Sequence, residues 1–279
     1  MRPPASADFT VRFWGVRGSI PAPGPETMRY GGNTTCIEVR CGGHLMIFDA
    51  GTGIRAFGGQ LAGEAPVDLD LFFTHTHFDH VAGLPFFVPA FDPRNRLRLW
   101  AGHLSPPQTI QSVLCDMMIA PLFPVPLSAF YGSCTFNDFQ CGAVLQPRPD
   151  IRIVTGPLNH PNGCCGYRVE FGGRVLAIVT DTEHLAEGHD DAVLELARGA
   201  DVMVYDGMYT DAAYPKHVGW GHSTWQQGCR VAEAAGVGRA VIFHHEPNHD
   251  DVIMDGIAVA AEEMRPGTLV AFEGMVLEL

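Results

Sequence analysis

The sequence predicts a domain of the α/β class, in which helices pack in layers against β-sheet. Short apolar runs typical of buried strands recur along all 279 residues, and fewer segments with helical spacing lie between and after them. Hydrophobic residues make up 46% of the chain and charged residues 18%. This balance is typical of a globular protein that can bury a sizeable core.

The expected strands are short, apolar and rich in β-branched or aromatic residues. They cover residues 9–14, 35–39, 44–48, 69–73, 97–100, 151–154, 166–171, 175–179, 202–205, 240–243 and 269–277. Their spread over the whole chain predicts that sheet forms the frame of the protein.

Helices are expected at residues 190–198, 224–235 and 251–264, where apolar positions recur at helical spacing. Ser223 is a suitable N-cap for the second of these helices, and Gly236 stands just past its end.

We expect residues 1–279 to form a single domain, with an irregular insertion at about residues 83–146. The insertion is rich in Pro, Phe and Met and has no clear period. Irregular core packing is one interpretation. A lid over a functional site and a dimer surface are the others, because exposed apolar patches often mark contacts.

The formal net charge of −13 argues against a broad nucleic-acid surface, which needs clustered Lys and Arg to meet phosphates. A small anionic ligand remains compatible with this charge, because bound metal ions supply local positive charge. The expected partner is therefore a small anionic substrate, with nucleic acid disfavoured.

No apolar run is long enough for a membrane span, and residues 1–8 lack the apolar region of a secretory signal. The eight cysteines have neither the spacing of a zinc finger nor the density of a disulfide framework. They favour reduced core thiols, so we expect a cytoplasmic protein without membrane contact.

The most informative motif contains His75, His77, Asp79 and His80, directly after the apolar run 69–73. Residues two apart on an extended backbone share a face, so His75 and His77 can point the same way. Asp79 and His80 fall where the chain should turn into a helix. One short segment could therefore supply two adjacent metal ions, and the mixture of imidazole and carboxylate favours a hydrolytic site. The order of these residues argues against surface histidines gathered by chance.

Three further ligand-type residues, His160, Asp181 and His244, stand at the ends of apolar runs. Each alone could be an ordinary turn or surface residue. Sheet proteins gather their sites at strand ends, however, where loops are free to vary. The recurrence of this placement predicts that all three join the first motif in one site.

The run from His75 to His80 has the pattern H-x-H-x-D-H, and the chain resembles the metallo-β-lactamase superfamily over nearly its whole length. The resemblance implies a four-layer αβ/βα sandwich, with two mixed sheets face to face and helices outside. It implies a first metal ion bound by His75, His77 and His160, a second bound by Asp79, His80 and His244, and Asp181 as the bridging carboxylate. His245 is the alternative to His244 if the preceding strand is one residue longer.

Within the superfamily, the chain resembles the phosphodiesterase-type branch, which includes ribonuclease Z and a cyclic phosphodiesterase of phosphonate metabolism. Flavodiiron proteins have Glu where this chain has His77, and the best-known zinc β-lactamases have Cys where it has Asp181. Residues 13–21 and 30–35 resemble the Gly-rich opening of that branch, although a simple glycine turn would look similar. Gly221-His222-Ser223 resembles its His-Ser/Thr element, in which the histidine helps hold phosphate and serves the leaving group; the alternative is a helix-cap neighbour without a role.

The resemblance implies a dinuclear metal hydrolase that cleaves a small, cyclic phosphodiester by attack of a metal-bridged hydroxide. Two divalent ions are expected, zinc first, with manganese or iron as alternatives. Asp79 is expected to orient the hydroxide as well as bind metal, and His222 to act as general acid. Asp49, Asp206 and Glu246 are expected to support the ligands.

Two other functions fit the same residues. One is hydrolysis of a lactone, ester or thioester on the same metal site, and the other is a non-catalytic regulatory protein that binds metal. The sequence has no Gly- and Lys-rich insertion of the kind that grips transfer RNA, so tRNA processing is not expected. A homodimer is compatible with the sequence.

Overall fold

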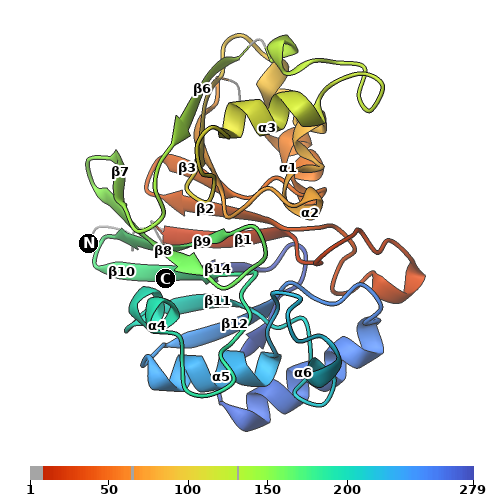
Figure 1. Cartoon of the computed structure of the whole chain (residues 1–279), viewed down its shortest axis with the longest axis vertical. Coiled ribbons are helices and arrows are strands. Elements are labelled where there is room, and N and C mark those ends of the chain that lie inside the picture. Colours follow the sequence, from red (N-terminus) through yellow and green to blue (C-terminus); the bar gives the residue numbers. More distant parts are fainter. Residues whose placement is uncertain (1–8, 64–65, 131) are drawn as a thin grey trace, which may run out of the picture.

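The computed structural model describes residues 9–63, 66–130 and 132–279. Residues 1–8, on which the expectation about a secretory signal rests, lie outside the described part. Two seven-stranded sheets lie face to face, and helices cover the outer side of each (Figure 1). This arrangement confirms the expected four-layer αβ/βα sandwich.

The first sheet comes mainly from the N-terminal half of the chain. Its strands are β1 (Phe9–Gly15), β2 (Cys36–Cys41), β3 (His44–Phe48), β4 (Asp68–Phe73), β5 (Arg96–Ala101), β6 (Ser133–Asp138) and β14 (Val276–Glu278). They lie in the order β14-β1-β2-β3-β4-β5-β6, and neighbours from β3 to β6 are parallel. The helices α1 (Gly53–Leu61) and α3 (Ile110–Met117) lie on the outer side, while the short α2 (Phe78–Val81) follows β4 at the edge (Figure 1).

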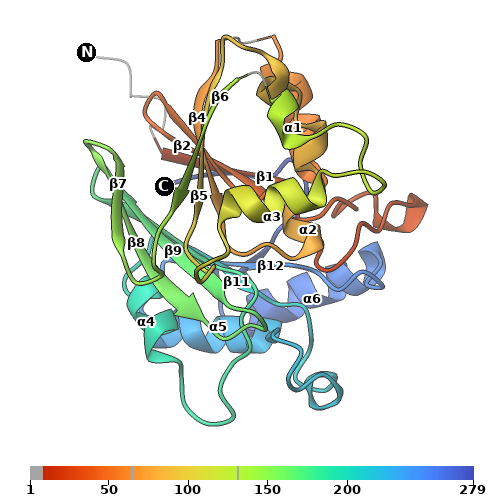
Figure 2. The same ribbon diagram turned by 45° about the horizontal axis from the view of Figure 1, so that its top comes forward.

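The second sheet comes from the C-terminal half. Its strands are β7 (Val144–Arg148), β8 (Ile151–Leu158), β9 (Cys164–Phe171), β10 (Arg174–Val179), β11 (Val202–Asp206), β12 (Arg239–Phe243) and β13 (Leu269–Val270). They lie in the order β13-β12-β11-β10-β9-β8-β7, with β10 to β13 parallel. The helices α4 (Asp191–Ala197), α5 (Trp225–Ala234) and α6 (Asp251–Met264) lie opposite α1 and α3 in both views (Figure 2).

Successive side chains along a strand point alternately toward the other sheet and toward the helices. In β4, Phe72 faces the other sheet, whereas Leu71 and Phe73 pack with the helix-side cluster. In β11, Val204 faces the first sheet and Tyr205 packs with the helix-side residues of the second. Because these central strands are buried on both faces, apolar residues occupy consecutive positions in them, as at 71–73 in β4 and 202–205 in β11.

Aromatic side chains fill the space between the two sheets. The ring of Phe72 lies 5.2 Å from Phe48, 5.7 Å from Trp100 and 5.7 Å from Tyr167, measured between ring centroids. Burial of each such side chain stabilises the fold by roughly 1.5–3 kcal/mol. This shared core holds the two sheets in register, so loops from both can build one site.

Two expectations about local structure are wrong. Residues 269–277 do not form one strand: β13 joins the second sheet, Gly274 turns the chain with a φ of 88°, and β14 joins the first sheet. The N-cap of α5 is Thr224 rather than Ser223, and its hydroxyl accepts from the Gln227 amide. Ser223 cannot serve because its buried hydroxyl contacts the Tyr205 hydroxyl at 3.1 Å.

The segment 83–146 contains more regular structure than its sequence indicates. It includes β5, α3, β6 and the first residues of β7, together with short 3-10 helices at Leu84–Phe86, Val88–Phe91 and Leu127–Ala129. α3 begins at a capping box in which Thr109 and Ser112 exchange side-chain and backbone hydrogen bonds. Serine in place of the usual Glu or Gln, together with the short helix, hid this signal in the sequence.

Within the described ranges, no helix is both long and apolar enough to cross a bilayer. All eight cysteines are free thiols. Most are at least partly buried, and Cys115 is the exposed one.

A buried hydrogen bond between the sheets should contribute measurably to stability. The Tyr167 hydroxyl donates to the Phe73 carbonyl oxygen at 2.5 Å, at the end of β4. Tyr167→Phe should lower the free energy of unfolding by about 1–2 kcal/mol, because an acceptor loses its buried donor. Urea denaturation measures the change. Tyr30→Phe removes a hydroxyl that contacts Asp255 at 3.2 Å in a partly exposed position, where water can replace it, and should stay within about 0.5 kcal/mol. An equal loss in both variants would contradict a larger contribution from the buried inter-sheet bond.

Candidate metal centre

The expected site residues follow the carboxyl ends of strands that point in the same direction within their sheet. His75 comes just after β4, His160 after β8, Asp181 after β10 and His244 after β12. Because these strands run in one direction within each sheet, their ends open on the same edge of the sandwich. The structure therefore brings residues far apart in the sequence together at one place.

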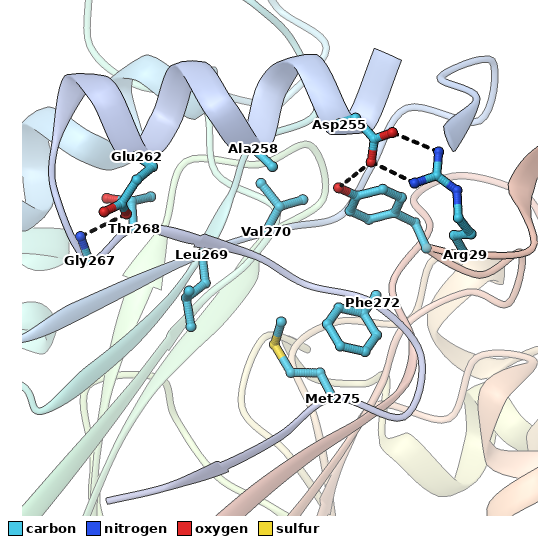
Figure 3. Close-up of a pocket in the computed structure, with 11 residues that line it drawn as sticks. Arg29, Asp255, Ala258, Glu262, Gly267, Thr268, Leu269, Val270, Phe272 and Met275 are labelled. Atoms are coloured by element: carbon cyan, nitrogen blue, oxygen red, sulfur yellow. Dashed lines mark hydrogen bonds and ion pairs between the residues drawn. The ribbon is translucent and has the colours of Figure 1, made fainter. Parts of the chain in front are cut away.

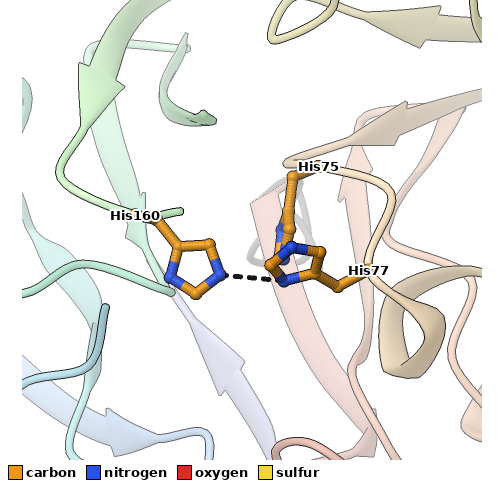
Figure 4. Close-up of side chains that lie close together, drawn as sticks. All are labelled: His75, His77 and His160. Atoms are coloured by element: carbon orange, nitrogen blue, oxygen red, sulfur yellow. Dashed lines mark hydrogen bonds between the residues drawn. The ribbon is translucent and has the colours of Figure 1, made fainter. Parts of the chain in front are cut away.

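His75, His77 and His160 form one group, with two rings from the first sheet and one from the second (Figure 4). His160 Nε2 lies 3.0 Å from His77 Nδ1. Nε2 of His75 is buried and has no hydrogen-bond partner among the residues that the structure describes. Three imidazole nitrogens that converge in this way leave at least one lone pair to be satisfied.

Asp79, His80, Asp181 and His244 form a second, fully buried group. His80 Nε2 lies 3.4 Å from Asp79 Oδ2, and His244 Nε2 lies 3.3 Å from the same oxygen. Burial alone would raise the pKa of Asp79, but His80 and His244 outweigh it and hold that pKa well below its usual range. The carboxylate therefore stays ionised.

Asp181 lies between the two groups. One of its oxygens, Oδ1, is 3.9 Å from His75 Nε2 and 3.2 Å from His244 Nε2. The other, Oδ2, is 3.3 Å from His80 Nε2 and accepts a hydrogen bond of 2.6 Å from the Thr180 hydroxyl. The two carboxylate oxygens thus reach residues of both groups.

The backbone is strained where the site is built. Asp49, Asp181 and His244 have φ values of 63°, 58° and 62°, in the left-handed region that L-residues avoid. Such a conformation costs roughly 1–2 kcal/mol per residue. Gly18 permits the close approach of the N-terminal loop, because a Cβ there would lie 2.4 Å from the His244 ring. Strain that gathers in this way is typical of functional sites.

Asp49 fixes the orientation of His80. Its carboxylate accepts hydrogen bonds from the Thr74 amide and hydroxyl, both at 2.8 Å, and contacts His80 Nδ1 at 2.9 Å. The Nδ1 hydrogen bond leaves Nε2 of His80 facing the cluster. Burial is the largest influence on the pKa of Asp49 and raises it, against the opposing effect of His80.

His222 also lies at the cluster, and Asp206 holds it there. Its Nδ1 is 2.8 Å from Asp206 Oδ2, and its ring stacks on His244 with centroids 5.0 Å apart. Burial opposes protonation, but Asp206 outweighs burial and raises the pKa of His222 to about 9. From the sequence, Asp206 is expected only to support the metal ligands from the end of a strand; its contact with His222 is visible in the structure alone.

His245 and Glu246 lie apart from these groups. His245 is buried, and its Nε2 hydrogen-bonds to the Ala271 carbonyl at 2.7 Å. The Glu246 carboxylate contacts Asn248, and the Glu246 carbonyl accepts from Arg17. The strand β12 ends at Phe243, so His244 is the residue that turns into the cluster.

The donor atoms fit divalent metal ions. Each group offers converging imidazole nitrogens or carboxylate oxygens, the ligand types that zinc, manganese and iron accept. Burial first, and then His80, lowers the pKa of His75 well below its usual range, so its imidazole is neutral. A neutral ring with an unpartnered, buried nitrogen is suited to bind a cation.

A family model described as a β-lactamase superfamily domain matches residues 44–245. This chain belongs to that family. The matched region begins at β3 and ends beside His244, so it includes every residue of the two groups.

Ribonuclease BN from Escherichia coli O1:K1 is 34% identical over 294 aligned positions, which cover 84% of this chain and 89% of the relative. Three solved structures have the same fold, each at less than a fifth sequence identity. They are a diphosphatase from the PhnP family (19% identity, TM-score 0.69, 97% of this chain and 98% of that one), the short form of human tRNase Z (18%, 0.67, 96% and 98%) and zinc-bound PqqB from Methylobacterium extorquens (18%, 0.74, 97% and 100%).

These comparisons confirm the expected superfamily and its nuclease and phosphodiesterase branch. The chain is a hydrolase of the metallo-β-lactamase fold. Its relatives include ribonuclease BN, and the structures that share its fold include a diphosphatase.

A pocket of about 700 Å³ lies elsewhere, between α6 and the segment that carries β13 (Figure 3). Arg29 and Tyr30 border it, both bonded to Asp255 of α6, and Phe272 and Met275 supply apolar surface. None of the residues expected at the metal centre lines this pocket. The volume of this pocket is therefore no reason to place the reaction there.

The carboxylate of Asp49 should matter for metal binding even though it does not reach the converging atoms. Asp49→Asn should weaken metal binding by roughly 10–100-fold, because the ring of His80 loses the anion that orients it. Titration of metal-free protein with Zn²⁺ measures the affinity. Asp150→Asn, at an exposed carboxylate, is the control. Unchanged affinity in Asp49→Asn would show that His80 is held by packing alone.

Proposed function

We propose that this protein is a dinuclear metal hydrolase that cleaves a small phosphodiester. The observation that carries the proposal is a buried His222–Asp206 pair, 2.8 Å apart, beside two groups of metal-type donors. Asp181 of the second group lies 3.9 Å from both His75 and His160 of the first. Metal donors alone would serve many hydrolases. A cationic imidazole beside the metal ions suits a phosphodiester, whose anionic phosphoryl group has two non-bridging oxygens to be neutralised.

His75, His77 and His160 would hold one metal ion, and Asp79, His80 and His244 the other, with Asp181 bridging. When bound, such a pair supplies an activated water at neutral pH and stabilises the charge on the phosphoryl oxygens. Zinc is the first expectation, supported by the zinc-bound PqqB structure of the same fold, with manganese and iron as alternatives. Residues of both sheets are needed for the site, which supports residues 1–279 as one domain.

Asp79 would bind metal and also orient the attacking water. Its Oδ2 accepts a hydrogen bond of 2.7 Å from the Ser19 amide, which fixes the orientation of the carboxylate. A fixed, ionised carboxylate can accept a hydrogen bond from the attacking water and align it with phosphorus.

His222 would act as the general acid. Asp206 accepts the hydrogen bond of Nδ1, so the proton on Nε2 is the one that the ring can deliver. The same carboxylate stabilises the imidazolium before transfer. The leaving oxygen then departs as a neutral hydroxyl group.

The small substrate follows from charge. A net charge of −13 opposes a long polyanion, whereas one phosphodiester can be neutralised locally. The likeness to ribonuclease BN favours RNA as a second candidate substrate. Hydrolysis of a lactone, ester or thioester is the third candidate and uses the same donors. A non-catalytic, metal-binding role is the remaining alternative.

Metal removal tests the bridging carboxylate. Dialysis against a chelator should abolish activity, and reloading should restore it with about two ions per chain. Asp181→Asn should reduce the metal content of the reloaded protein to one ion or fewer, because two adjacent cations lose their shared anion. Elemental analysis measures the content, with Asp201→Asn at a strand end away from the centre as control. Two tightly bound ions in Asp181→Asn would contradict a bridging role.

His222→Ala should separate the candidate reactions. If His222 is the general acid, the variant should keep its metal ions and lose roughly 100-fold or more in turnover on an alkyl phosphodiester. A nitrophenyl phosphodiester should suffer much less, because its leaving group needs little proton assistance. Steady-state kinetics on both substrates measures the difference, with His44→Ala at a partly exposed histidine as control.

The substrate panel decides among the alternatives. Faster wild-type turnover of lactones or thioesters than of any phosphodiester, with little dependence on His222, would replace the proposal with an acyl hydrolase. Cleavage of RNA alone would favour the second candidate. No turnover of any substrate by fully loaded protein would leave the regulatory role.

A further inference from the structure

Glu183 is a buried carboxylate, 8% exposed, that the chemistry proposed above does not use. It lies two residues after Asp181, on the loop that follows β10. A buried carboxylate is unfavourable unless charged or polar groups satisfy it. The groups that satisfy Glu183 therefore indicate what it does.

The partners of Glu183 belong to the loop between β11 and α5. Its Oε1 accepts from the Gly219 amide and from the Tyr214 hydroxyl, both at 2.7 Å. Its Oε2 accepts from the Gly221 amide at 2.8 Å and from Gly219 at 3.0 Å. The carboxylate therefore binds both amides of a Gly-Trp-Gly turn. Hydrogen bonds to an ionised acceptor are roughly twice as strong as those between neutral groups.

The turn needs such an anchor because of its composition. Gly219 and Gly221 have φ values of 86° and 82°, which only glycine adopts readily. Gly221 also touches the site: a Cβ there would lie 2.4 Å from His160 Nδ1. Two glycines give the free turn a large conformational entropy, so it adopts one conformation only if something binds it.

The anchored turn orients two histidines. The Gly221 carbonyl accepts from His160 Nδ1 at 2.8 Å, which directs Nε2 of that ring toward His77. The next residue is His222, whose position is set by the same short stretch of backbone. One peptide unit thus contacts the ring of His160 and carries His222.

The backbone of Glu183 reaches His160 from the other side. Its amide donates to the Asn159 carbonyl at 2.8 Å, and its carbonyl accepts from the Asn159 side chain at 2.9 Å. Asn159 directly precedes His160. Glu183 therefore connects the β8, β10 and β11 loops at the point where all three meet the metal centre.

We propose that Glu183 is a positioning residue that sets the orientation of His160 and His222 together, through the Gly219–Gly221 turn. The functional consequence rests on the proposed roles of these histidines as metal ligand and general acid. One carboxylate then couples metal occupancy of the His75–His77–His160 group to the placement of the acid. Loss of Glu183 should impair both, although it touches neither metal nor substrate.

Glu183→Gln tests the proposal with a side chain of nearly the same shape. The amide keeps one acceptor, but its NH₂ group faces a backbone N–H, so the turn loses one anchor. Zn²⁺ titration of metal-free protein should show one of the two affinities weakened by roughly 10–100-fold, the size of effect seen when a ligand loses its orienting partner. Glu187→Gln, at an exposed carboxylate on the same loop, should bind as the wild type does.

The reloaded Glu183→Gln protein should also show the leaving-group pattern of His222→Ala. Turnover of an alkyl phosphodiester should fall by roughly tenfold or more, and turnover of a nitrophenyl phosphodiester should fall less. A general loosening of the fold would slow both substrates alike. Thermal unfolding of the metal-free variant should match the metal-free wild type, which separates positioning from simple destabilisation. Tyr214→Phe removes one partner of the carboxylate and gives a milder variant if Glu183→Gln folds poorly.

The outcomes are distinguishable. Wild-type affinity for both ions in Glu183→Gln and Tyr214→Phe would overturn the proposal, whatever the reaction. Weakened binding of one ion, without any phosphodiesterase activity in the wild type, would keep the positioning role of Glu183 toward His160 and reject the proposed function. Weakened binding with equal losses on both phosphodiesters would overturn the coupling to His222.

Discussion

The carboxylate of Asp181, buried between histidines from two sheets, is the constraint on which the rest of the site depends. Its oxygens lie within 4 Å of His75, His80 and His244, so three loops must meet where β10 ends. A carboxylate is tolerated in such a place only if positive charge compensates it. Protonated imidazole can supply part of that charge, because burial opposes protonation of His80 but Asp181 and Asp79 outweigh burial and raise its pKa well above the usual range. Burial and His80, however, lower the pKa of His75 and drive it to its neutral form. Divalent cations resolve this conflict, because they neutralise the carboxylates and use the lone pairs of neutral rings.

The fold supplies what this arrangement needs, which is many strand ends facing one edge with a rigid core beneath them. Phe48, Phe72 and Tyr167 lock the two sheets against each other, so the loops above them start from fixed points. The backbone can then hold left-handed φ values at Asp49, Asp181 and His244. These residues do not stabilise the fold locally; the packed strands that precede them sustain the strain.

Much of the site could be predicted from the sequence because its residues stand at strand ends. His75 to His80, His160, Asp181 and His244 each follow an apolar run, and a run that is buried on both faces is easy to recognise. The two wrong expectations, about residues 269–277 and about the N-cap of α5, concern features that depend on residues distant in the sequence. The break of residues 269–277 into β13 and β14 is decided by which sheet each half meets. The Thr224 cap is decided by Tyr205 and His184, which contact the Ser223 hydroxyl. No periodicity records such contacts, and the layering itself came from family resemblance.

The partners of the acidic residues that orient the site histidines also could not be predicted from the sequence, because they are distant along the chain. Asp49, Asp206 and Glu183 are all acidic, and each follows a strand end or lies close to one, but the sequence could not say which ring or loop each one holds. In the structure each carboxylate has a different partner. Asp49 contacts His80, and Asp206 contacts His222. Glu183 binds the turn that packs against His160. His80, His222 and His160 therefore each have Nδ1 committed to an oxygen of the protein, which leaves Nε2 free for other contacts. Part of the negative charge of the chain therefore lies next to the site. These carboxylates contact the histidines from outside the cluster, where they can compensate bound cations without blocking an anionic substrate.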